Sequence, residues 1–399
     1  MSLRFGRFFI IIQSKERGRL RKVSGGMFRL FCRTLQLTSC RMASHNLPIE
    51  RTAEPPLIDK PVRHRTSIHT KSFYWNRLAM ASPVSSAAPS DYTAAIVLRQ
   101  FWGITAVPER VSAGVSRDNW RTGEAFWLSY SEAGERARFL REAELLRALP
   151  FRLKSLGAAW TVPEVVPTVE NESIATSEHG LWRMTRHVHG QEPDPRHPGT
   201  YPALAAMLAE VHRVLRSIPY SLAVCERGIV EKGRNLLQTY RASSFSCVIQ
   251  DPRERLLVQT LCEWLELRLS VLEAEPRQLT HGDWIPGNLK VSADGWAVLD
   301  WEFCRLDPVV MDLAQSCCTL LMWSGLNRVA DRIDELVHRY SELTGHQVLM
   351  ESVPAAMVLF WLNNYNHWHG RQARIGRYGH VLELLPERLR QVGTFVGAL

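Results

Sequence analysis

Long hydrophobic runs are missing from this chain. No apolar stretch among its 399 residues approaches the roughly 18 to 20 residues that span a bilayer, so an integral membrane protein is not expected. The composition, 45% hydrophobic and 22% charged, also argues against collagen, a coiled coil and a wholly disordered chain. At this length we expect two or three compact units, and no internal repeat is visible.

Cysteine is sparse and poorly placed for cross-links. Most of the eight cysteines lie far apart, Cys317 and Cys318 are direct neighbours, and no CxxC motif occurs. A disulfide framework and a zinc site are therefore not expected. A reducing compartment is the simplest explanation, and we expect the protein to be cytoplasmic.

Acidic residues are scarce only near the start of the chain. Residues 1–90 hold 16 Lys and Arg but 4 Asp and Glu, whereas the remaining 309 residues hold 33 basic and 36 acidic groups. The formal charge of +9 thus belongs to the N-terminal segment, and no nucleic-acid partner is expected. We predict that residues 1–90 form a basic, disordered extension. An organelle-targeting segment and translated sequence ahead of a start at Met80 are the alternatives.

Beyond residue 90 the pattern becomes that of an ordered chain. Residues 92–102 predict an amphipathic helix, and Gly123, between two aromatic and β-branched runs, predicts a hairpin turn. A helix is expected over 133–149, closed by Pro150.

Strand-like segments continue to a Pro-rich link near residue 190, and the chain beyond that link is mainly helical in pattern. Residues 201–218, for example, have an apolar face with helical spacing. We therefore predict a small sheet-bearing lobe over 91–190 and a larger helical lobe over 191–399.

One compact block holds most of the residues suited to chemistry. It reads Thr-His-Gly-Asp-Trp-Ile-Pro-Gly-Asn-Leu-Lys-Val over 280–291 and Ala-Val-Leu-Asp-Trp-Glu over 297–302. Each acid or amide taken alone is an ordinary turn or capping residue, because Asp, Asn and Gly favour such positions. The ordered set is what points to a site.

The spacing within this block predicts a hairpin that gathers oxygen ligands. Strands over 289–291 and 296–299 would return Asp300 to the neighbourhood of Asn288. Mg²⁺ prefers such hard oxygen ligands, with one or two protein carboxylates and the phosphates of a substrate. Asp283, on the loop before the first strand, would be free to accept a proton from a hydroxyl.

The block resembles the aminoglycoside phosphotransferase and choline kinase group, in which H-G-D-x4-N is followed by a hydrophobic run and D-W-E. The group's downstream D-P and D-L-A elements correspond to Asp307-Pro and Asp312-Leu-Ala. This resemblance implies an α+β, bilobal protein-kinase-like fold with a small antiparallel-sheet N-lobe and a larger, mainly helical C-lobe. It also implies transfer of the γ-phosphate of ATP or GTP, with Mg²⁺, to a hydroxyl of a small metabolite or antibiotic.

The resemblance also implies roles for individual residues. Asp283 would be the catalytic base or hydroxyl-orienting group, and Asn288 and Asp300 would hold the metal. His281 would support the loop by hydrogen bonding, and Asp312 would hydrogen-bond the loop from behind. Catalysis of phosphoryl transfer depends mainly on positioning and charge neutralisation, so these few groups would suffice.

The nucleotide side departs from the kinase pattern. Such enzymes place a strand lysine over the α- and β-phosphates and pair it with a glutamate on the next helix. Glu142, on the apolar seam of the predicted helix, is the candidate glutamate. The position that resembles the lysine is Ser129, and residues 91–399 contain only three lysines, none of them before Lys154.

Three explanations are open for the missing lysine. Arg121 on the neighbouring strand would reach the phosphates, since guanidinium binds phosphate well. Alternatively, Arg136 or Arg138 takes the role, if the strand register differs. A degenerate site is the third explanation, and the protein would then be a nucleotide-binding pseudokinase or regulatory binding protein.

Two weaker features complete the predicted nucleotide site. The loop around Gly114 would point backbone N–H groups toward a phosphate. The segment that contains Met184 would offer backbone groups to the base from its place between the lobes.

The aromatic and polar side chains between Trp361 and His369 lie where the group builds its acceptor pocket, although helical spacing makes the aromatic ones equally good core residues.

Overall fold

The structure is a computed structural model that describes residues 9–12, 21–24, 89–111, 117–225, 227–241, 249, 251–324, 326–370 and 379–397. The chain divides into two compact units, Met1–Ser85 and Ser86–Leu399. In the first unit, β1 (Phe9–Ile12) and β2 (Arg21–Ser24) form an antiparallel pair. Most of the predicted N-terminal extension lies outside the described residues.

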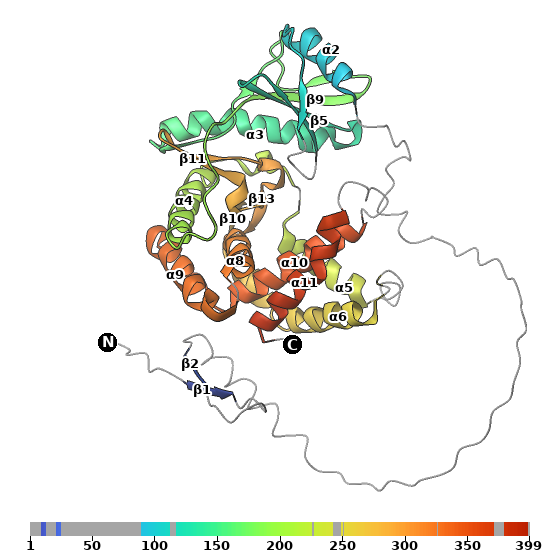
Figure 1. Ribbon diagram of the computed structural model, residues 1–399. Helices are drawn as coiled ribbons and strands as arrows, with labels where there is room; N and C mark the ends of the chain where they lie inside the picture. Colours follow the sequence, from blue (N-terminus) through green and yellow to red (C-terminus); the bar gives the residue numbers. More distant parts are fainter. Residues whose placement is uncertain are drawn as a thin grey trace, which may run out of the picture. The chain divides into compact units, whose positions relative to one another are not determined.

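The second unit begins with a six-stranded antiparallel sheet (Figure 1). Its path runs through β3 (Glu109–Val111), β4 (Asp118–Thr122), β5 (Phe126–Ser131), β9 (Gly180–Arg186) and β7 (Val165–Val166), and β8 (Ala175–Ser177) pairs with β9. The predicted hairpin is confirmed as β4–β5, whose turn contains Gly123 at φ +59°. This left-handed backbone is the one that glycine adopts without strain.

Two helices pack on this sheet. The first, α2 (Asp91–Trp102), confirms the predicted amphipathic helix and buries Ala94, Val97, Leu98 and Trp102 against the sheet residues Trp120, Leu128 and Trp182. The second, α3 (Arg136–Ser155), follows the short 3-10 helix η3 (Ala133–Glu135) and buries Phe139 and Ala143 against Leu181.

The predicted end of α3 at Pro150 is wrong. The helix continues through the proline to Ser155. A proline cannot donate the hydrogen bond to the carbonyl four residues earlier, here that of Leu146, so it weakens a helix interior. Burial of Leu149 and Leu153 on either side of the proline stabilises this turn of the helix, while Pro150 itself is exposed.

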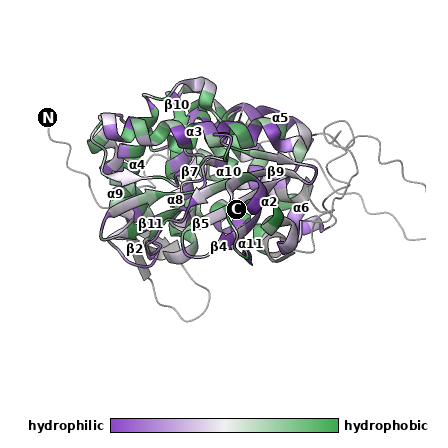
Figure 2. Cartoon of the chain, turned by 90° about the horizontal axis from the view of Figure 1, so that it is seen from above, coloured by the Kyte–Doolittle hydropathy of each residue, from purple (hydrophilic) through white to green (hydrophobic). Residues whose placement is uncertain are grey.

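Beyond the sheet, the chain is mainly helical (Figure 1). The helices are α4 (Thr200–Leu215), α5 (Ile229–Arg241), α6 (Pro252–Glu266), α7 (Leu269–Ala274), α8 (Val310–Ser324), α9 (Leu326–Thr344), α10 (Ser352–Gly370) and α11 (Gly379–Phe395), with the short η4 (Tyr220–Leu222). Polar and apolar residues both occur along these helices (Figure 2), as expected of elements that bury one face. The predicted apolar face of α4 is buried, with Leu204, Leu208, Val211 and Leu215 at 0% exposure.

Two small sheets hold the predicted chemical block. One pairs β10 (Arg277–Thr280) with β13 (Arg305–Pro308), and the other joins β11 (Leu289–Ser292), β12 (Gly295–Val298) and the short β6 (Trp160–Thr161). The predicted hairpin is confirmed as β11–β12. The short helices η6 (Pro286–Asn288) and η7 (Trp301–Phe303) flank it.

This arrangement is a bilobal, α+β, protein-kinase-like fold, with the sheet and α2–α3 as the N-lobe and the helices from α4 onward as the C-lobe. The segment after β9 connects the lobes, where the backbone groups of Gln191 and Val291 bond reciprocally at 2.9 and 2.8 Å. Among the described helices, none combines the length and the apolar character required to traverse a bilayer.

Candidate active site

A pocket of about 370 Å³ opens between the two lobes. Residues of β4, β5, α3 and β9 form one wall, and the end of the β11–β12 hairpin forms the other. The side chains with chemical potential in its lining include Arg117, Ser129, Glu142, Arg183, Lys290 and Asp300. Asp300, predicted as a metal ligand, and Glu142, predicted at the nucleotide, therefore line the same cavity.

Asp283 and Asn288 are brought together by the loop between β10 and β11. The Asn288 amide donates to the Asp283 carboxylate at 2.7 Å and to the Asp283 carbonyl at 2.9 Å. Burial raises the pKa of Asp283 to about 6, against the lowering effect of that Asn288 hydrogen bond. A half-buried carboxyl group with this pKa is suited to accept a proton near neutral pH.

The hairpin returns Asp300 to this loop. The N–H of Leu299 donates to the carbonyl of Asn288 at 2.8 Å, which fixes the two strand ends side by side. Asp300 itself has a left-handed backbone, φ +58° and ψ +68°, which is uncommon for a residue with a side chain. Such strained conformations concentrate at functional sites.

The Asp300 carboxylate is surrounded by negative charge. The cleft walls withdraw it from bulk solvent, and together with the carboxylates of Glu302, Asp283 and Glu142 they raise its pKa well above the ordinary value. Its side chain is nevertheless exposed to the pocket and forms no hydrogen bond or ion pair with any residue that the structure describes. A cation in this place would relieve the repulsion between the carboxylates.

The donors present here fit Mg²⁺. Because the Asn288 nitrogen faces Asp283, its oxygen is left for a ligand, and Asp300 supplies the carboxylate. Mg²⁺ commonly uses one or two protein groups and completes its shell with water and phosphate oxygens. Within the described residues, no cluster of three or more His, Cys, Asp and Glu side chains is placed to hold a metal ion.

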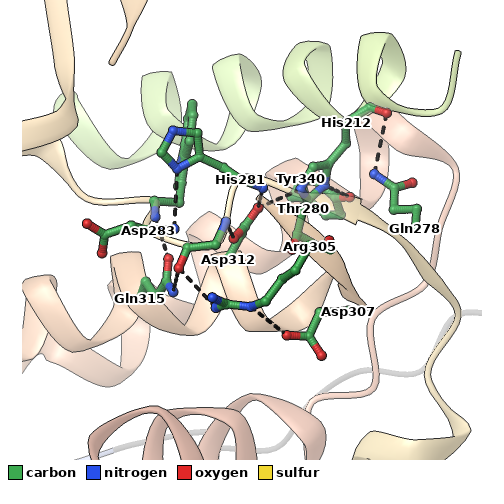
Figure 3. A network of polar contacts seen from close by, with 12 residues as sticks. His212, Gln278, Thr280, His281, Asp283, Arg305, Asp307, Asp312, Gln315 and Tyr340 are labelled. Atoms are coloured by element: carbon green, nitrogen blue, oxygen red, sulfur yellow. Dashed lines mark hydrogen bonds and ion pairs between the residues drawn. The ribbon is translucent and has the colours of Figure 1, made fainter. Parts of the chain in front are cut away.

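Asp312 holds the loop before Asp283 from behind (Figure 3). Its carboxylate accepts from the backbone N–H groups of His281 and Gly282, both at 2.8 Å, and lies 2.9 Å from Nε2 of His212. Burial would raise the pKa of Asp312, but these hydrogen bonds and the histidine lower it below the ordinary value. The expected contact between Asp312 and the loop is thus present.

The Gly282 carbonyl group of the same loop is hydrogen-bonded as well (Figure 3). The Gly282 oxygen accepts from Arg305 at 2.9 Å and from Gln315 at 2.8 Å. Arg305 in turn pairs with Asp307 at 2.8 Å, and Asp307 accepts from the first N–H groups of α5. The Asp283 loop is therefore tied to α8, β13 and α5 at once.

Both ring nitrogens of His281 lie within hydrogen-bonding distance of backbone groups. Its Nε2 lies 2.8 Å from the carbonyl of Leu299, and its Nδ1 lies 3.3 Å from the N–H of Asp283. Burial, opposed by nearby Asp312, lowers the pKa of His281. A neutral imidazole here links the Asp283 loop to the residue before Asp300.

Two arginines, rather than a lysine, pair with Glu142. Arg117 lies 2.5 Å from one carboxylate oxygen and Arg183 lies 2.8 Å from the other. Burial alone would raise the pKa of Glu142, but the two guanidinium charges outweigh it and lower the pKa to about 2. The glutamate is 2% exposed, so this pairing is what allows its charge to be buried.

Glu302 links these groups to the C-lobe. Its carboxylate lies 3.2 Å from Arg117 and 3.2 Å from Arg138, and its carbonyl accepts from Arg138 at 3.2 Å. The chain of ion pairs therefore runs Arg183, Glu142, Arg117, Glu302, Arg138 and joins α3 to η7.

Two predicted nucleotide contacts lie elsewhere. Arg121 is half-exposed, pairs with Glu109 at 3.0 Å and is not among the pocket residues. Met184 is buried in the sheet between Leu128 of β5 and Val166 of β7 and is not among the pocket residues either. The segment that does line the pocket after β9 is His187 and Val188.

The remaining predictions on this side have mixed outcomes. Ser129 lies in the pocket wall, as its lysine-like position predicted, and donates to Asn119 at 2.7 Å. Arg136 bonds Thr176, away from the pocket, whereas Arg138 reaches Glu302.

Part of the predicted site falls on residues that the structure does not describe. Gly114 lies outside the described residues, as do the side chains of Trp368 and His369. Of the aromatic residues near the predicted acceptor pocket, Tyr365 is buried and bonds Glu254, as its helical spacing allowed.

Sequence reasoning missed Arg117, Arg183, Glu302 and Arg305. The pairing of β5 with β9 would have pointed to Arg183, because Arg183 lies directly opposite Ser129 in that register. An arginine facing the vacant lysine position on the adjacent strand could have been identified from that pairing.

Comparison with known families agrees with this geometry. The model of the phosphotransferase enzyme family matches residues 108–352, more than half of the chain. The chain belongs to the phosphotransferase enzyme family. The predicted family is therefore confirmed, while no curated protein matches significantly.

Solved structures show the same fold as this family member. An aminoglycoside 2'-phosphotransferase-IIIa in complex with GDP is 18% identical, with a TM-score of 0.53 over 75% of this chain and 97% of that one. A spectinomycin phosphotransferase, APH(9)-Ia, bound to AMP is 15% identical, with a TM-score of 0.53 over 76% and 99%. The amicoumacin kinase hAmiN, in complex with AMP-PNP, Ca²⁺ and Ami, is 14% identical, with a TM-score of 0.51 over 71% and 87%.

Proposed function

We propose that this phosphotransferase family member transfers the γ-phosphate of ATP or GTP to a hydroxyl group of a small molecule. The observation that carries the proposal is the hydrogen-bonded pair of Asp283 and Asn288 beside the hairpin end at which Asp300 lines the interlobe pocket. Solved structures of the same fold bind GDP, AMP or AMP-PNP, and others bind kanamycin or gentamicin. These likenesses support a nucleotide in the pocket and a small hydroxylated compound as the acceptor.

Each residue has a defined part in this proposal. Asp283 orients the acceptor hydroxyl and accepts its proton as the new P–O bond forms and the bond from the γ-phosphorus to the β-phosphate oxygen breaks, releasing the nucleoside diphosphate. Asn288 holds the Asp283 carboxylate in place. Asn288 and Asp300 would bind Mg²⁺, which supplies charge neutralisation at the phosphates when present. His281 and Asp312 keep the loop in one conformation, so the reacting groups are already oriented when substrate binds.

Purified protein, incubated with Mg²⁺, ATP or GTP and a panel of aminoglycosides, other antibiotics and amino alcohols, tests this function. We expect phosphorylated product from at least one acceptor and a loss of turnover of at least about 100-fold in Asp283→Ala, the size typical of a general base. Asp294→Asn is the matched control, because Asp294 is an exposed residue of the β11–β12 turn. Turnover by Asp283→Ala at the control rate would contradict the role of Asp283.

A second candidate is a nucleotide-binding protein without efficient transfer. The observation in its favour is Ser129, which lies in the pocket wall where kinases of this fold carry the phosphate-binding lysine. Thermal-shift and product assays on the same sample separate the two candidates. Stabilisation by Mg²⁺–nucleotide without product from any acceptor would favour the binding protein.

A further inference from the structure

The basic residues of the pocket fall into an outer and an inner group. Lys290 pairs with Glu192 and Arg186 pairs with Glu164, both toward solvent. Arg117 and Arg183 instead lie at the inner end, with side chains 13% and 6% exposed. A group that replaces the strand lysine at the inner end of the pocket therefore comes from this second pair.

Of the two, Arg117 lies on the side of the predicted metal site. Its guanidinium lies 3.2 Å from the carboxylate of Glu302, two residues beyond Asp300, whereas Arg183 pairs with Glu142 on α3. A nucleotide whose phosphates bridge to a cation at Asp300 would therefore bring phosphate oxygens toward the Arg117 guanidinium. Arginine presents a planar set of donors that matches phosphate oxygens.

The buried groups around Arg117 share their partners and include donors that have none among the described residues. Three guanidinium groups, those of Arg183, Arg117 and Arg138, share the two buried carboxylates of Glu142 and Glu302. Glu135, which also lies near Arg138, is 3.8 Å away on the solvent side. In addition, Nε and Nη1 of Arg183 are buried without a hydrogen-bond partner among the described residues. Asp300, which lines the same pocket, brings the acids near the three guanidinium groups to three. The cluster therefore offers an anion its unpaired donors, and a cation bound at Asp300 would leave it positively charged.

Because Glu142 and Glu302 each have a second arginine partner, Arg117 can turn away without leaving either carboxylate unpaired. If it turns to a phosphate, Glu142 keeps Arg183 at 2.8 Å and Glu302 keeps Arg138 at 3.2 Å. A buried carboxylate left without a partner is strongly destabilising. If Glu142 had one arginine partner only, that arginine could not turn to a phosphate without this cost. The second partner of each acid removes that cost.

We propose that Arg117 binds the nucleotide phosphates in place of the absent strand lysine, and that Arg183 and Arg138 are positioning residues that keep Glu142 and Glu302 paired while it does so. This inference rests on the proposed function. It goes further because it assigns the phosphate contact to Arg117, which lies outside the strand that carries the phosphate-binding lysine in kinases of this fold.

Calorimetric titration with Mg²⁺–ADP and with adenosine separates phosphate contacts from base contacts. For Arg117→Gln we expect ADP affinity to fall at least about 10-fold and adenosine affinity to stay within about twofold of the unsubstituted protein, since the loss of a charge-assisted contact affects only the ligand with phosphates. Arg117→Lys, which retains a cation, should recover most of the ADP affinity. Arg136→Gln is the matched control, since Arg136 bonds Thr176 away from the pocket.

A melting measurement tests the positioning residues. Arg117→Gln should melt near the unsubstituted protein, because Glu142 keeps Arg183, whereas the double variant Arg117→Gln with Arg183→Gln should melt markedly lower. Equal ADP affinity in Arg117→Gln and the unsubstituted protein would overturn the inference, as would an equal loss of ADP and adenosine affinity. If the unsubstituted protein binds neither ligand, the proposed function fails as well, so the two failures are distinguishable.

Discussion

At the scale of single residues, Gly282 shows how closely the loop before Asp283 is packed. Its φ is +85°, and a Cβ atom added there would lie 2.1 Å from the carbonyl oxygen of Phe303, closer than real Cβ atoms approach. Its N–H and carbonyl groups are both bound, to Asp312 and to Arg305 and Gln315. Glycine at this position thus lets the backbone before Asp283 approach η7 directly.

We expect Gly282→Ala to lower both stability and activity. A left-handed conformation alone costs of order 1–3 kcal/mol for a residue with a side chain, and here the clash with Phe303 adds to it. Gly345→Ala is the control, because Gly345 has a similar φ of +68° and open space around its Cβ position. Chemical denaturation of both variants checks this. Equal losses would show that the contact with Phe303 does not matter.

At the scale of elements, α3 carries the groups that define the predicted nucleotide side of the site. Its inner face presents Glu142 to two arginines, and its outer face is exposed at Glu144. The helix continues past Pro150, so its last turns lack one hydrogen bond. Both features lead to predictions about stability.

Glu142 makes part of the stability depend on pH. Its pKa is about 2 in the folded protein, below the ordinary value of 4.5, so the stabilisation is complete above pH 4.5 and is lost as the pH falls toward 2. The stability gap between the unsubstituted protein and Glu142→Gln should therefore shrink by about 1.4 kcal/mol per pH unit below the ordinary value. Denaturation at about pH 6 and about pH 3.5, on either side of that value, measures the gap, with the exposed Glu144→Gln as control. A gap that does not change with pH would contradict the pairing with Arg117 and Arg183.

Replacement of Pro150 should stabilise the protein. In Pro150→Ala the N–H at this position can bond the carbonyl of Leu146, and a helix-interior proline is about 3 kcal/mol less favourable than alanine in an isolated helix. Because proline also restricts the unfolded chain, which offsets part of this difference, we expect a gain of about 1–2 kcal/mol without a change in nucleotide affinity. Chemical denaturation measures the gain, and Glu144→Ala on the same helix should stay within about 0.5 kcal/mol. A loss of stability in Pro150→Ala would indicate that the proline has a packing role.

At the scale of the whole molecule, the site is made by two lobes that meet around Glu302. This residue is 2% exposed and pairs with Arg117 and Arg138, so it connects the N-lobe wall of the pocket to the end of the β11–β12 hairpin. A ligand that contacts both walls of the pocket should therefore stabilise both lobes together.

We expect Mg²⁺ with ATP or GTP to raise the melting temperature. At a free concentration about 100 times the dissociation constant, the stabilisation is about 2.7 kcal/mol. In Asp300→Asn the shift should be smaller, and the dependence on Mg²⁺ should be reduced, because the carboxylate that would bind the cation is gone. Asp294→Asn is the control, because it removes the same charge at a position in the β11–β12 turn, away from the proposed metal site. An unchanged Mg²⁺ dependence in Asp300→Asn would contradict the proposed metal site.

The sequence by itself determined the local elements and the order of the chemical block. The periodicity of α2 and α4, the turn at Gly123 and the β11–β12 hairpin are set by neighbouring residues, so they could be predicted from spacing alone. The family and the fold followed from the H-G-D-x4-N and D-W-E pattern. That pattern also pointed to Asp283, Asn288 and Asp300, because a single loop and one hairpin bring them together.

Only the tertiary structure decided which cations surround Glu142. Arg117, Arg183 and Arg138 come from three separate segments, and their distances to Glu142 and Glu302 depend on strand register and on the packing of α3 against η7. Arg121, one of the arginines considered because it lies on the strand next to Ser129, pairs with Glu109 instead. Such long-range ion pairs are selected by burial, which penalises an unpaired charge, and burial is not visible in a local sequence pattern.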